Sequence, residues 1–358
     1  GKHRSGAAFG QTRRREPFLR RERTPSVTVL LPKLPSISDA IRERILNEAR
    51  TEALHRELLS EAEAMNALEV GGAGSAGILP KEVGIAAWNM ERCLFPEASA
   101  AHLAPHHPGI VLLSEVDYGM SRTGQRNTAA DMAEGLGMHY AYGVEFFELG
   151  LGGPTERKYC TDDFNSLGFH GNGILSAVPF ESATLIRLDD HGHWFTPDQN
   201  AADPEQPRLG GRMAVAAIVP TEGGLLCVAS THLESNAGVE HRGAQFDRLM
   251  DALDDFAPGL PVVVGGDLNT GNHLPPDYDW QQETLFDAAR ARGYSWDLTP
   301  EGVTTRASLI TPHQTRRMKL DWFCARDVSG HAGPLVKSLG PDGTPLSDHE
   351  CVFATLHL

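Results

Sequence analysis

The stretch from Pro261 to Thr270, PVVVGGDLNT, ends in two side chains that could do chemistry. Its run of apolar, β-branched residues predicts a strand buried on both faces, and two glycines let the backbone leave the sheet tightly. Asp267 and Asn269 point to the same side if strand geometry continues through Leu268. A carboxylate there can orient and deprotonate a water, and a neutral amide can donate to a phosphoryl oxygen. An ordinary Asp/Asn turn uses the same residue types, so this stretch alone leaves both interpretations open.

Acids also end two other apolar strands. Asn89 and Glu91 close the segment WNME and share a face, and Glu115 closes the segment LLSE. An ionised carboxylate at the end of an apolar strand needs solvent or a partner, and a divalent cation is a natural partner. Oxygen ligands without a Cys/His cluster favour Mg²⁺, Mn²⁺ or Ca²⁺ over zinc. Each acid taken singly could be a solvated strand end, whereas three such endings together favour a shared cation.

Two histidines also stand next to the ends of predicted strands. His232 ends the strand STH, where it could be an incidental hydrogen-bonding residue, and His349 stands in SDHE just before the last strand. Asp321 lies inside the apolar strand LDWF and needs a partner. If Asp321 holds the ring of His349, it fixes the tautomer and favours the protonated form, which suits a residue facing an anionic phosphate. Asp348, on the opposite side of the backbone, could face a metal instead.

From residue 82 onward, short apolar strands alternate with amphipathic helices. This pattern predicts an α/β fold, a four-layer α/β/β/α sandwich of two packed mixed sheets with helices outside, in one domain over 81–358. Strands are expected at 83–89, 110–115, 138–144, 172–178, 212–219, 225–232, 261–266, 319–324 and 350–357, and helices near 97–106, 126–136, 238–256 and 281–292.

The first eighty residues are expected to form an extension in three parts. Residues 1–35 mix Arg, Gly, Ser and Pro with little periodicity, which predicts a basic, disordered tail. Segment 36–69 has apolar residues at roughly helical spacing, which predicts one long amphipathic helix over 39–68. Residues 70–80 are rich in glycine and predict a flexible linker. The helix could pack on its own body or on a partner chain.

The composition is typical of a soluble globular protein, with 41% hydrophobic residues and a mean hydropathy of -0.29. No apolar run reaches the roughly 18 residues of a membrane span, and no apolar segment near the start suits a secretory signal. The five cysteines are odd in number and lack CxxC spacing, which favours a reducing compartment and argues against structural zinc. A cytoplasmic location is therefore expected.

The formal net charge of -15 is unevenly distributed. Residues 1–24 hold eight Lys and Arg against two Glu, so the remainder of the chain is still more acidic. Such a body repels long polyanions unless a local basic groove exists, which argues against duplex DNA as the main partner. The basic tail could still touch RNA, DNA or anionic lipid, although short basic termini are usually just disordered.

Taken in order, these motifs resemble those of the endonuclease/exonuclease/phosphatase superfamily of DNase I-like, Mg²⁺-dependent phosphoesterases. The resemblance rests on WNME, LLSE, GNGILS, STHLES, GGDLNT, LDWF and SDH, which follow one another from about residue 83. It implies a metal site at Asn89, Glu91 and Glu115, with Glu115 the principal ligand, and a further metal or water ligand at Asp348. It also implies a phosphate contact at His232, a water-activating Asp267, a phosphoryl-binding Asn269 and an Asp-His pair of Asp321 and His349.

Two long connections, 145–169 and 187–211, are expected to rim the pocket and select the substrate, because long loops without periodicity are usually functional or disordered. In the second loop, His191 and His193 could add a metal ligand. Arg212 directly after it could pair with an anionic substrate or form a structural ion pair.

Asn172, in GNGILS, could face the site, and after glycine it could equally be a turn residue.

The resemblance implies in-line attack of water on phosphorus without a covalent enzyme intermediate. The acidic body and mixed-sign loops favour a Mg²⁺-dependent phosphodiesterase or phosphatase with a small-molecule or phospholipid-type substrate, with Mn²⁺ able to substitute. A nuclease guided by the basic tail is the first alternative. A catalytically silent binding protein, recruiting partners through the 39–68 helix, is the second.

Overall fold

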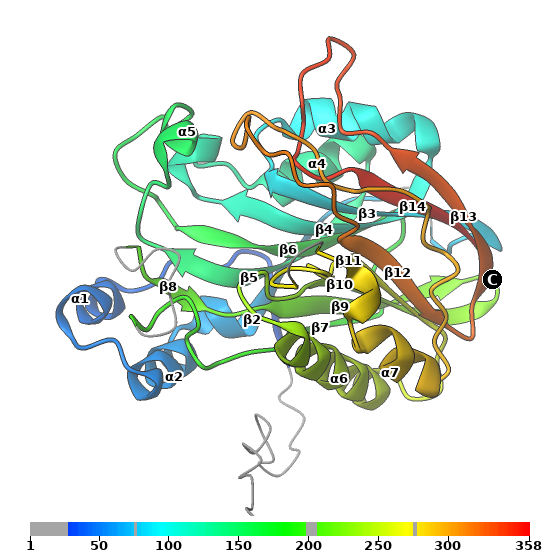
Figure 1. Ribbon diagram of the computed structural model, residues 1–358, viewed down its shortest axis with the longest axis horizontal. Coiled ribbons are helices and arrows are strands. Elements are labelled where there is room, and N and C mark those ends of the chain that lie inside the picture. Colours follow the sequence, from blue (N-terminus) through cyan, green and yellow to red (C-terminus); the bar gives the residue numbers. More distant parts are fainter. Residues whose placement is uncertain (1–27, 75–76, 198–205, 275–277) are drawn as a thin grey trace, which may run out of the picture.

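Two β-sheets face each other at the centre of the computed structural model, which describes residues 28–74, 77–197, 206–274 and 278–358 (Figure 1). The first sheet contains β1 (Val29–Leu31), β2 (Ala67–Gly72), β3 (Glu82–Arg92), β4 (Pro108–Tyr118), β5 (His139–Glu148), β6 (Phe169–Ser176), β8 (Arg208–Gly210), β13 (Ser329–Val336) and β14 (Cys351–His357). The second contains β7 (Ser182–Arg187), β9 (Met213–Thr221), β10 (Gly224–His232), β11 (Val262–Asp267) and β12 (Asp321–Arg326).

Both sheets are mixed. The strand order in the first is β1-β2-β5-β6-β4-β3-β14-β13, with β8 paired to β5, and the order in the second is β12-β11-β10-β9-β7. In each sheet one central pair, β3 with β4 and β10 with β11, is parallel, and its neighbours are antiparallel. The edge of a sheet at which the two parallel strands end is therefore also the edge at which their antiparallel neighbours begin.

Helices cover the outer faces of the two sheets (Figure 1). On the first sheet lie α3 (Pro96–Leu103) and α4 (Thr128–Leu136), together with α1 (Asp39–Asn47) and α2 (Glu52–Glu61) near its β8 end. On the second sheet lie α6 (Val239–Phe256) and α7 (Leu285–Ala291). A single turn, α5 (Pro154–Arg157), stands in the connection between β5 and β6. The predicted four-layer α/β/β/α sandwich is confirmed.

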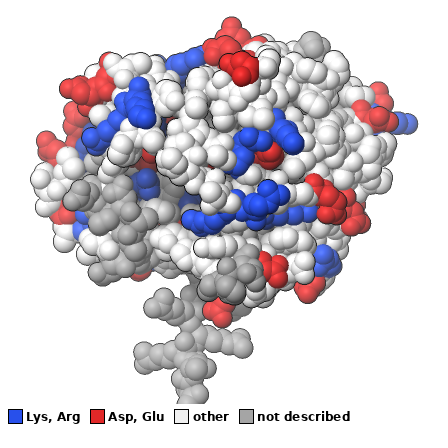
Figure 2. All heavy atoms as spheres, turned by 45° about the horizontal axis from the view of Figure 1, so that its top comes forward, with Lys and Arg blue, Asp and Glu red and all other residues white. Residues whose placement is uncertain are grey.

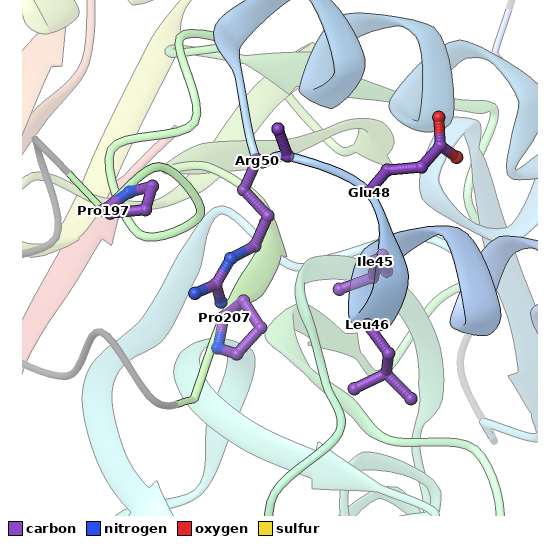
Figure 3. Close-up of a pocket in the computed structure, with 7 residues that line it drawn as sticks. Ile45, Leu46, Glu48, Arg50, Pro197 and Pro207 are labelled. Atoms are coloured by element: carbon purple, nitrogen blue, oxygen red, sulfur yellow. The ribbon is translucent and has the colours of Figure 1, made fainter.

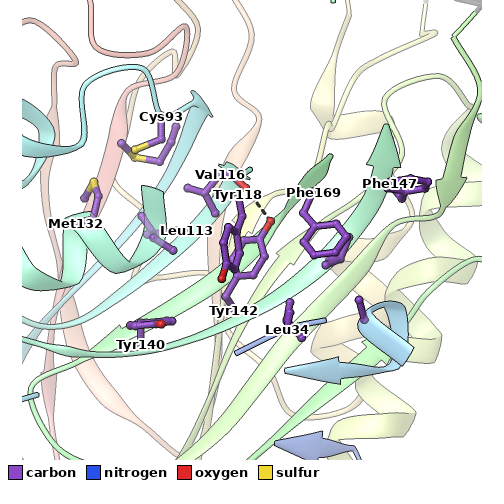
Figure 4. Close-up of a cluster of buried hydrophobic side chains, with 14 of the residues drawn as sticks. Leu34, Cys93, Leu113, Val116, Tyr118, Met132, Tyr140, Tyr142, Phe147 and Phe169 are labelled. Atoms are coloured by element: carbon purple, nitrogen blue, oxygen red, sulfur yellow. Dashed lines mark hydrogen bonds between the residues drawn. The ribbon is translucent and has the colours of Figure 1, made fainter. Parts of the chain in front are cut away.

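Three apolar clusters fill the spaces between these layers. Along β3, Ile85 and Ala87 belong to the cluster between the sheets, whereas Ala86 and Trp88 belong to the outer cluster under the helices. Because the strand buries both faces, its sequence is continuously apolar rather than alternating. Figure 4 shows part of the outer cluster, where the hydroxyl of Tyr142 donates to the Val116 carbonyl at 3.1 Å.

All nine predicted strands and the four helices predicted after residue 81 are present, with small shifts at their ends. The prediction missed β1, β2, β7, β8 and β13. Of these, β1, β7 and β13 are edge strands and β8 has three residues, so little apolar burial marks them. Within the described residues, no helix combines the length and apolar character that crossing a membrane requires.

The single helix predicted over 39–68 is wrong, because the chain forms two helices there. Ser38 caps α1 by accepting from the amide of Ile41, and Thr51 caps α2 by accepting from the amide of Leu54. Between them the backbone is extended at Glu48, so the helical run is interrupted. The apolar faces of both helices are buried against the protein's own sheet.

The predicted boundary between an N-terminal extension and the main domain is also wrong, since residues 67–72 form β2 within the first sheet. The misleading residue is Glu69, which is 2% exposed and interrupts the apolar pattern. Its carboxylate accepts from the Tyr118 and Tyr140 hydroxyls, the Asn127 side chain and the Leu34 amide, at 2.7 to 2.9 Å. Of the predicted tail, residues 1–27 lie outside the described residues, whereas 29–31 form β1 beside β2.

Candidate active site

Three candidate residues meet at one edge of the second sheet because of strand register. His232 ends β10 and lies opposite Asp267, which ends β11. Asp267 lies in turn opposite Asp321, the first residue of the antiparallel β12. Two parallel strand ends and one antiparallel strand start therefore place an imidazole and two carboxylates side by side.

The first sheet brings Asn89 and Glu115 to the same place. Asn89, near the end of β3, donates through Nδ2 to Asp267 Oδ2 at 2.9 Å, and the same amide contacts Glu115 Oε2. The bond to Asp267 joins the two sheets directly at the candidate site. The site is therefore assembled from both layers of the sandwich.

The backbone leaves regular strand geometry at several of these positions. Glu91, Glu115 and Asn269 have φ values of 44°, 53° and 50°, which side chains other than glycine rarely adopt. Register shifts in the β3–β4 and β4–β6 pairs coincide with the first two. Regular strand geometry is therefore interrupted at Glu91 within β3 and ends at Asp267, so the two-residue spacing no longer implies a shared face for Asn89 and Glu91, or for Asp267 and Asn269. Such conformations cost about 1–3 kcal/mol each and are typical of functional sites.

The imidazole of His349 lies between two carboxylates. Its Nδ1 lies 2.7 Å from Asp321 Oδ2, and its Nε2 lies 3.5 Å from Asp267 Oδ2. Burial alone would lower the pKa of His349, but Asp321 and then Asp267 raise it well above the usual value. The predicted Asp-His pair is thus present, with an imidazolium that presents Nε2 toward Asp267.

His232 stands on the other side of Asp267. Its Nδ1 lies 3.1 Å from Glu145 Oε2 and its Nε2 lies 3.4 Å from Asp267 Oδ2. Burial lowers the pKa of His232, but the carboxylates of Glu145 and Asp267 together raise it to about 10. Asp267 is consequently flanked by two cations. Burial would raise the pKa of Asp267, yet His349 and His232 together hold it below its ordinary value.

Glu91 and Asp348 form a second acidic pocket beside this centre. Burial first, and the neighbouring Asp348 charge second, raise the pKa of Glu91 to about 9. Ser308 donates to Glu91 at 2.9 Å, whereas Asp348 Oδ1 is buried without a hydrogen bond among the described residues. Two crowded carboxylates and an unsatisfied oxygen suit a hard divalent cation.

Glu115 belongs to a group of possible ligands at the centre of the site. Ligand atoms of Glu115, His232 and Asp267 all lie within 4.8 Å of one another. Burial would raise the pKa of Glu115, but the contacting Arg92 guanidinium and the nearby histidines together lower it. The donor set, with Asn89 between the two acids, fits a divalent metal bound mainly through oxygen.

The two candidate asparagines make backbone contacts. Asn269 donates through Nδ2 to the Leu233 carbonyl at 2.8 Å, and its own amide donates to Asp267 Oδ1 at 2.9 Å, so the Asp/Asn turn is present. Asn172 donates to the Met213 carbonyl at 3.1 Å, and its Oδ1 is buried without a hydrogen bond in the described structure. Asn269 follows the end of β11, whereas Asn172 lies in the middle of β6, and the substrate contacts expected of both stay predictions.

Arg212 is a buried member of the site. It pairs with Glu234 at 3.1 Å and with Glu145 at 3.5 Å, and its Nη1 lies 3.1 Å from His232 Nδ1. The structural ion pair that the sequence left open is therefore formed. The two histidines of the preceding loop do not join the acid and histidine centre. Ligand atoms of His191, Asp189 and Asp190 lie within 4.8 Å of one another, and His193 Nε2 lies 2.9 Å from the Asn236 carbonyl.

A cavity of about 340 Å³ opens beside the acids. The two predicted loop regions do line it, through Phe146 and Glu148 from the first and Trp194 and Arg208 from the second. The remaining lining residues are Arg92, Glu115, His170, Arg212, His232 and Ser235. A separate hollow beside the end of α1, shown in Figure 3, is lined by Ile45, Leu46, Glu48, Ala49, Arg50, Pro197 and Pro207 and lacks the acid and histidine centre.

Several site residues escaped the sequence analysis. His170 lies 2.7 Å from Asp117 and 3.8 Å from Glu115, and Glu145 holds His232. Period-two spacing could have drawn attention to Asp117 and His170, since Asp117 follows Glu115 by two positions and His170 precedes Asn172 by two, but not to Glu145. Arg92 and Arg208 had no such signal, because their importance depends on contacts between distant segments.

The fold and the site together define a two-sheet sandwich with an acid and histidine centre at its strand ends. The chain belongs to the endonuclease/exonuclease/phosphatase family, whose model matches residues 86–349. Members of this family are generally hydrolytic phosphoesterases that use a divalent metal. The resemblance seen in the motifs is therefore confirmed at the level of the family.

Known proteins share this fold at low sequence identity. The endonuclease/exonuclease/phosphatase from Beutenbergia cavernae DSM 12333 is 20% identical, with a TM-score of 0.52 over 77% of this chain and 72% of that one. The human Nocturnin catalytic domain with bound sulfate anion is 17% identical, with a TM-score of 0.52 over 81% and 97%. Uncharacterized protein YbhP of Escherichia coli K12 is 25% identical over 197 residues. This match covers 53% of the present chain and 64% of the length of that relative.

Proposed function

We propose that the protein is a divalent-metal-dependent phosphoester hydrolase that acts on a small-molecule or phospholipid-type substrate by in-line attack of water. The observation that carries the proposal is the convergence of Glu115, Asp267 and His349 from three distant segments on one buried centre. Family membership supports the reaction class.

Glu115, Glu91 and Asp348, with Asn89 beside them, would hold the metal. When bound, a divalent cation supplies charge neutralisation for the non-bridging phosphoryl oxygens and the departing alkoxide.

Asp267 is the group that orients the attacking water and takes its proton. The two neighbouring histidines keep the pKa of Asp267 low, so the carboxylate is ionised, and the amides of Asn89 and Asn269 fix its orientation. His232 and His349, both with raised pKa values, are donors to the oxygens on which negative charge builds.

The cavity favours a compact anionic substrate. Its volume is about 340 Å³, and three arginines and two histidines line it. On the face shown in Figure 2, Lys and Arg gather across the middle and around a hollow, whereas Asp and Glu lie mainly toward the periphery. Local positive charge in a chain of net charge -15 supports an anionic ligand at this face.

The direct test is a screen of the full chain with Mg²⁺ or Mn²⁺ against phosphomonoesters, nucleotide diesters, phosphoinositides, phospholipids and sphingomyelin. Turnover that is abolished by a chelator and restored by added metal would support the proposal. Glu115→Gln should weaken metal binding measured by calorimetry, whereas the exposed Glu82→Gln should leave it unchanged. Absence of both metal binding and turnover would instead favour the silent binding protein.

One surface supports a nuclease as the second candidate. The loop after Thr305 carries exposed Arg316 and Arg317, and the Arg316 guanidinium lies 5.3 Å from the ring centroid of exposed Tyr278. Arg306 at the start of this loop donates its amide to the Asp348 carbonyl at 2.9 Å, so the loop adjoins the site. Basic and aromatic side chains together are typical of single-strand binding.

Plasmid and single-stranded DNA or RNA in the same screen separate the two candidates. If the protein is a nuclease, cleavage should fall with salt and with the double variant Arg316→Gln/Arg317→Gln, and with removal of residues 1–27 if the basic tail guides the substrate. If activity is confined to small or lipid substrates, none of these changes should affect it strongly.

A further inference from the structure

One wall of the active-site cavity is built from arginines that the hydrolytic centre does not use. Arg208 comes from β8, and Arg92 comes from the end of β3. They share the cavity with Glu115, which we place at the metal. These guanidinium groups would strengthen the binding of an anionic group but not of an uncharged or apolar one.

The arginines and acids of this wall form a ladder that leads away from the metal position. Arg92 contacts Glu115 and, through Nε, lies 3.2 Å from Glu156. Arg122 bridges Glu156 and Glu148 at 2.5 Å and 2.9 Å. The ladder ends at Arg208, whose Nε lies 2.5 Å from Glu148. Arg208 therefore sits at the end of the ladder opposite to the reacting centre.

Arg208 keeps hydrogen-bonding capacity at this position. Glu148 is shared between Arg208 and Arg122, so one carboxylate faces two guanidinium groups. Among the described residues, Nε is the only atom of the Arg208 side chain that makes a hydrogen bond, and this side chain is 20% exposed. Its two terminal nitrogens can serve a ligand in the cavity, since a guanidinium offers five N–H donors.

The aromatic ring of Trp194 holds this guanidinium in place. Arg208 lies 5.1 Å from the ring centroid of Trp194, which also lines the cavity. Trp194 is anchored by a 2.8 Å hydrogen bond from Nε1 to Glu234. A planar guanidinium stacked on a fixed ring loses little freedom when it binds a carboxylate or phosphate in a bidentate way.

We propose that Arg208, supported by Arg92 and Trp194, forms a subsite for a second anionic group of the substrate, a phosphate or carboxylate remote from the ester that is hydrolysed. The inference rests on the proposed function, because it takes the Glu115 end of the cavity as the place of the reacting ester. It narrows the substrate class to compact phosphoesters with two anionic groups.

Non-hydrolysable probes test the subsite by binding, independently of turnover. Methylphosphonate carries one anionic group, phosphonoacetate adds a carboxylate, and alkyl bisphosphonates with one to four methylenes add a second phosphonate. Calorimetry on the full chain at a buffered excess of free Mg²⁺ measures the affinity of each. At least one two-anion probe should bind 10- to 100-fold more tightly than methylphosphonate, roughly the effect of one charge-assisted hydrogen-bonded pair.

Arg208→Gln should remove this preference and leave methylphosphonate binding unchanged. Arg208→Lys, which keeps the charge but not the fork, should retain part of it, and exposed Arg290→Gln should retain all of it. A preference for phosphonoacetate or for a bisphosphonate identifies the second group as carboxylate or phosphate.

Equal affinity of the wild type for one-anion and two-anion probes would overturn the inference, as would an unchanged preference in Arg208→Gln. Melting temperatures of both Arg208 variants show whether they are folded, and Arg208→Lys decides the outcome if Arg208→Gln is not. A protein that hydrolyses phosphoesters but shows no preference contradicts the subsite alone. A protein with the preference but without turnover contradicts the proposed reaction alone.

Discussion

Asp267 receives more polar contacts than any simple strand terminus would need. Asn89 and the Asn269 amide donate to its two oxygens, and the imidazoles of His232 and His349 stand on either side. Each contact stabilises the ionised form, which offsets the cost of burying a carboxylate at 1% exposure. A structural turn would need only the amide contact.

Asp267→Asn should therefore abolish hydrolysis while the fold survives. The amide has nearly the same shape but cannot take a proton from water, so we expect a loss of about 10² to 10⁴ in kcat. Turnover of whichever substrate the screen identifies provides the measurement, and far-UV circular dichroism checks the fold. Asp297→Asn, at an exposed position, is the matched control. Near-normal turnover in Asp267→Asn would remove the role assigned to this carboxylate.

At the scale of elements, β2 depends on one buried acid. Glu69 ties four segments together through the four hydrogen bonds that its carboxylate accepts. Glu69→Ala would leave three buried donors and one half-buried donor without a partner, so we expect the unfolding free energy to fall by about 3 kcal/mol or more. Urea denaturation measures it.

Glu69→Gln, which keeps one acceptor oxygen, should lie between the wild type and Glu69→Ala. A loss below about 1 kcal/mol in Glu69→Ala would show that water satisfies these donors instead.

The contact between α2 and β8 should make stability depend on pH. His55 donates from Nδ1 to the Asp190 carbonyl at 2.7 Å and accepts from the Gly210 amide at Nε2, 3.0 Å away, so it is held neutral. Burial lowers the pKa of His55 below its usual value. The unfolded chain then binds the proton more readily than the folded one, so stability is full above about pH 6.5 and falls as the pH drops below it.

Denaturant unfolding between pH 5 and 7.5 should show this slope, up to about 1.4 kcal/mol per pH unit for one proton. His55→Gln should reduce the slope, whereas exposed His313→Gln should not change it. If both variants keep the full wild-type slope, His55 is not the titrating group.

What the sequence revealed depended on how each element is buried. Strands such as β3 and β11 bury both faces and carry continuous apolar runs, so their positions and terminal acids were predictable. The break between α1 and α2 depended on the Thr51 cap, and β2 was hidden by Glu69, whose partners come from β4, β5 and α4. Local patterns cannot show such distant partners.

The site residues likewise differ in whether the local sequence could predict them. Asp267, His349 and Glu115 end or precede apolar strands and carried a signal, whereas Glu145 and Arg208 gain their roles only from pairing between segments. The positive φ values at Glu91 and Asn269 could not be foreseen either, because a two-residue spacing implies one face only in a regular strand.

At the scale of the whole molecule, a bound cation should stabilise the fold, since several buried acids face one another without one. Mg²⁺ or Mn²⁺ at 100 times its dissociation constant should add about 2.7 kcal/mol to the unfolding free energy. Thermal denaturation with and without a chelator measures this, and Glu115→Gln should show a much smaller increase. A melting temperature that does not respond to either ion would contradict the metal site.

The hydrogen bond from Asn89 to Asp267 spans the seam between the two sheets. Further hydrogen bonds cross the same seam, from Ser230 to the Leu113 carbonyl and from Asn172 to the Met213 carbonyl, so the proposed catalytic centre depends on the alignment of the two sheets. A shift between the sheets too small to unfold any helix would already disrupt the proposed catalytic centre. During gradual warming, turnover should disappear before the circular dichroism signal does. Simultaneous loss of both would show that the two sheets separate only when the whole protein unfolds.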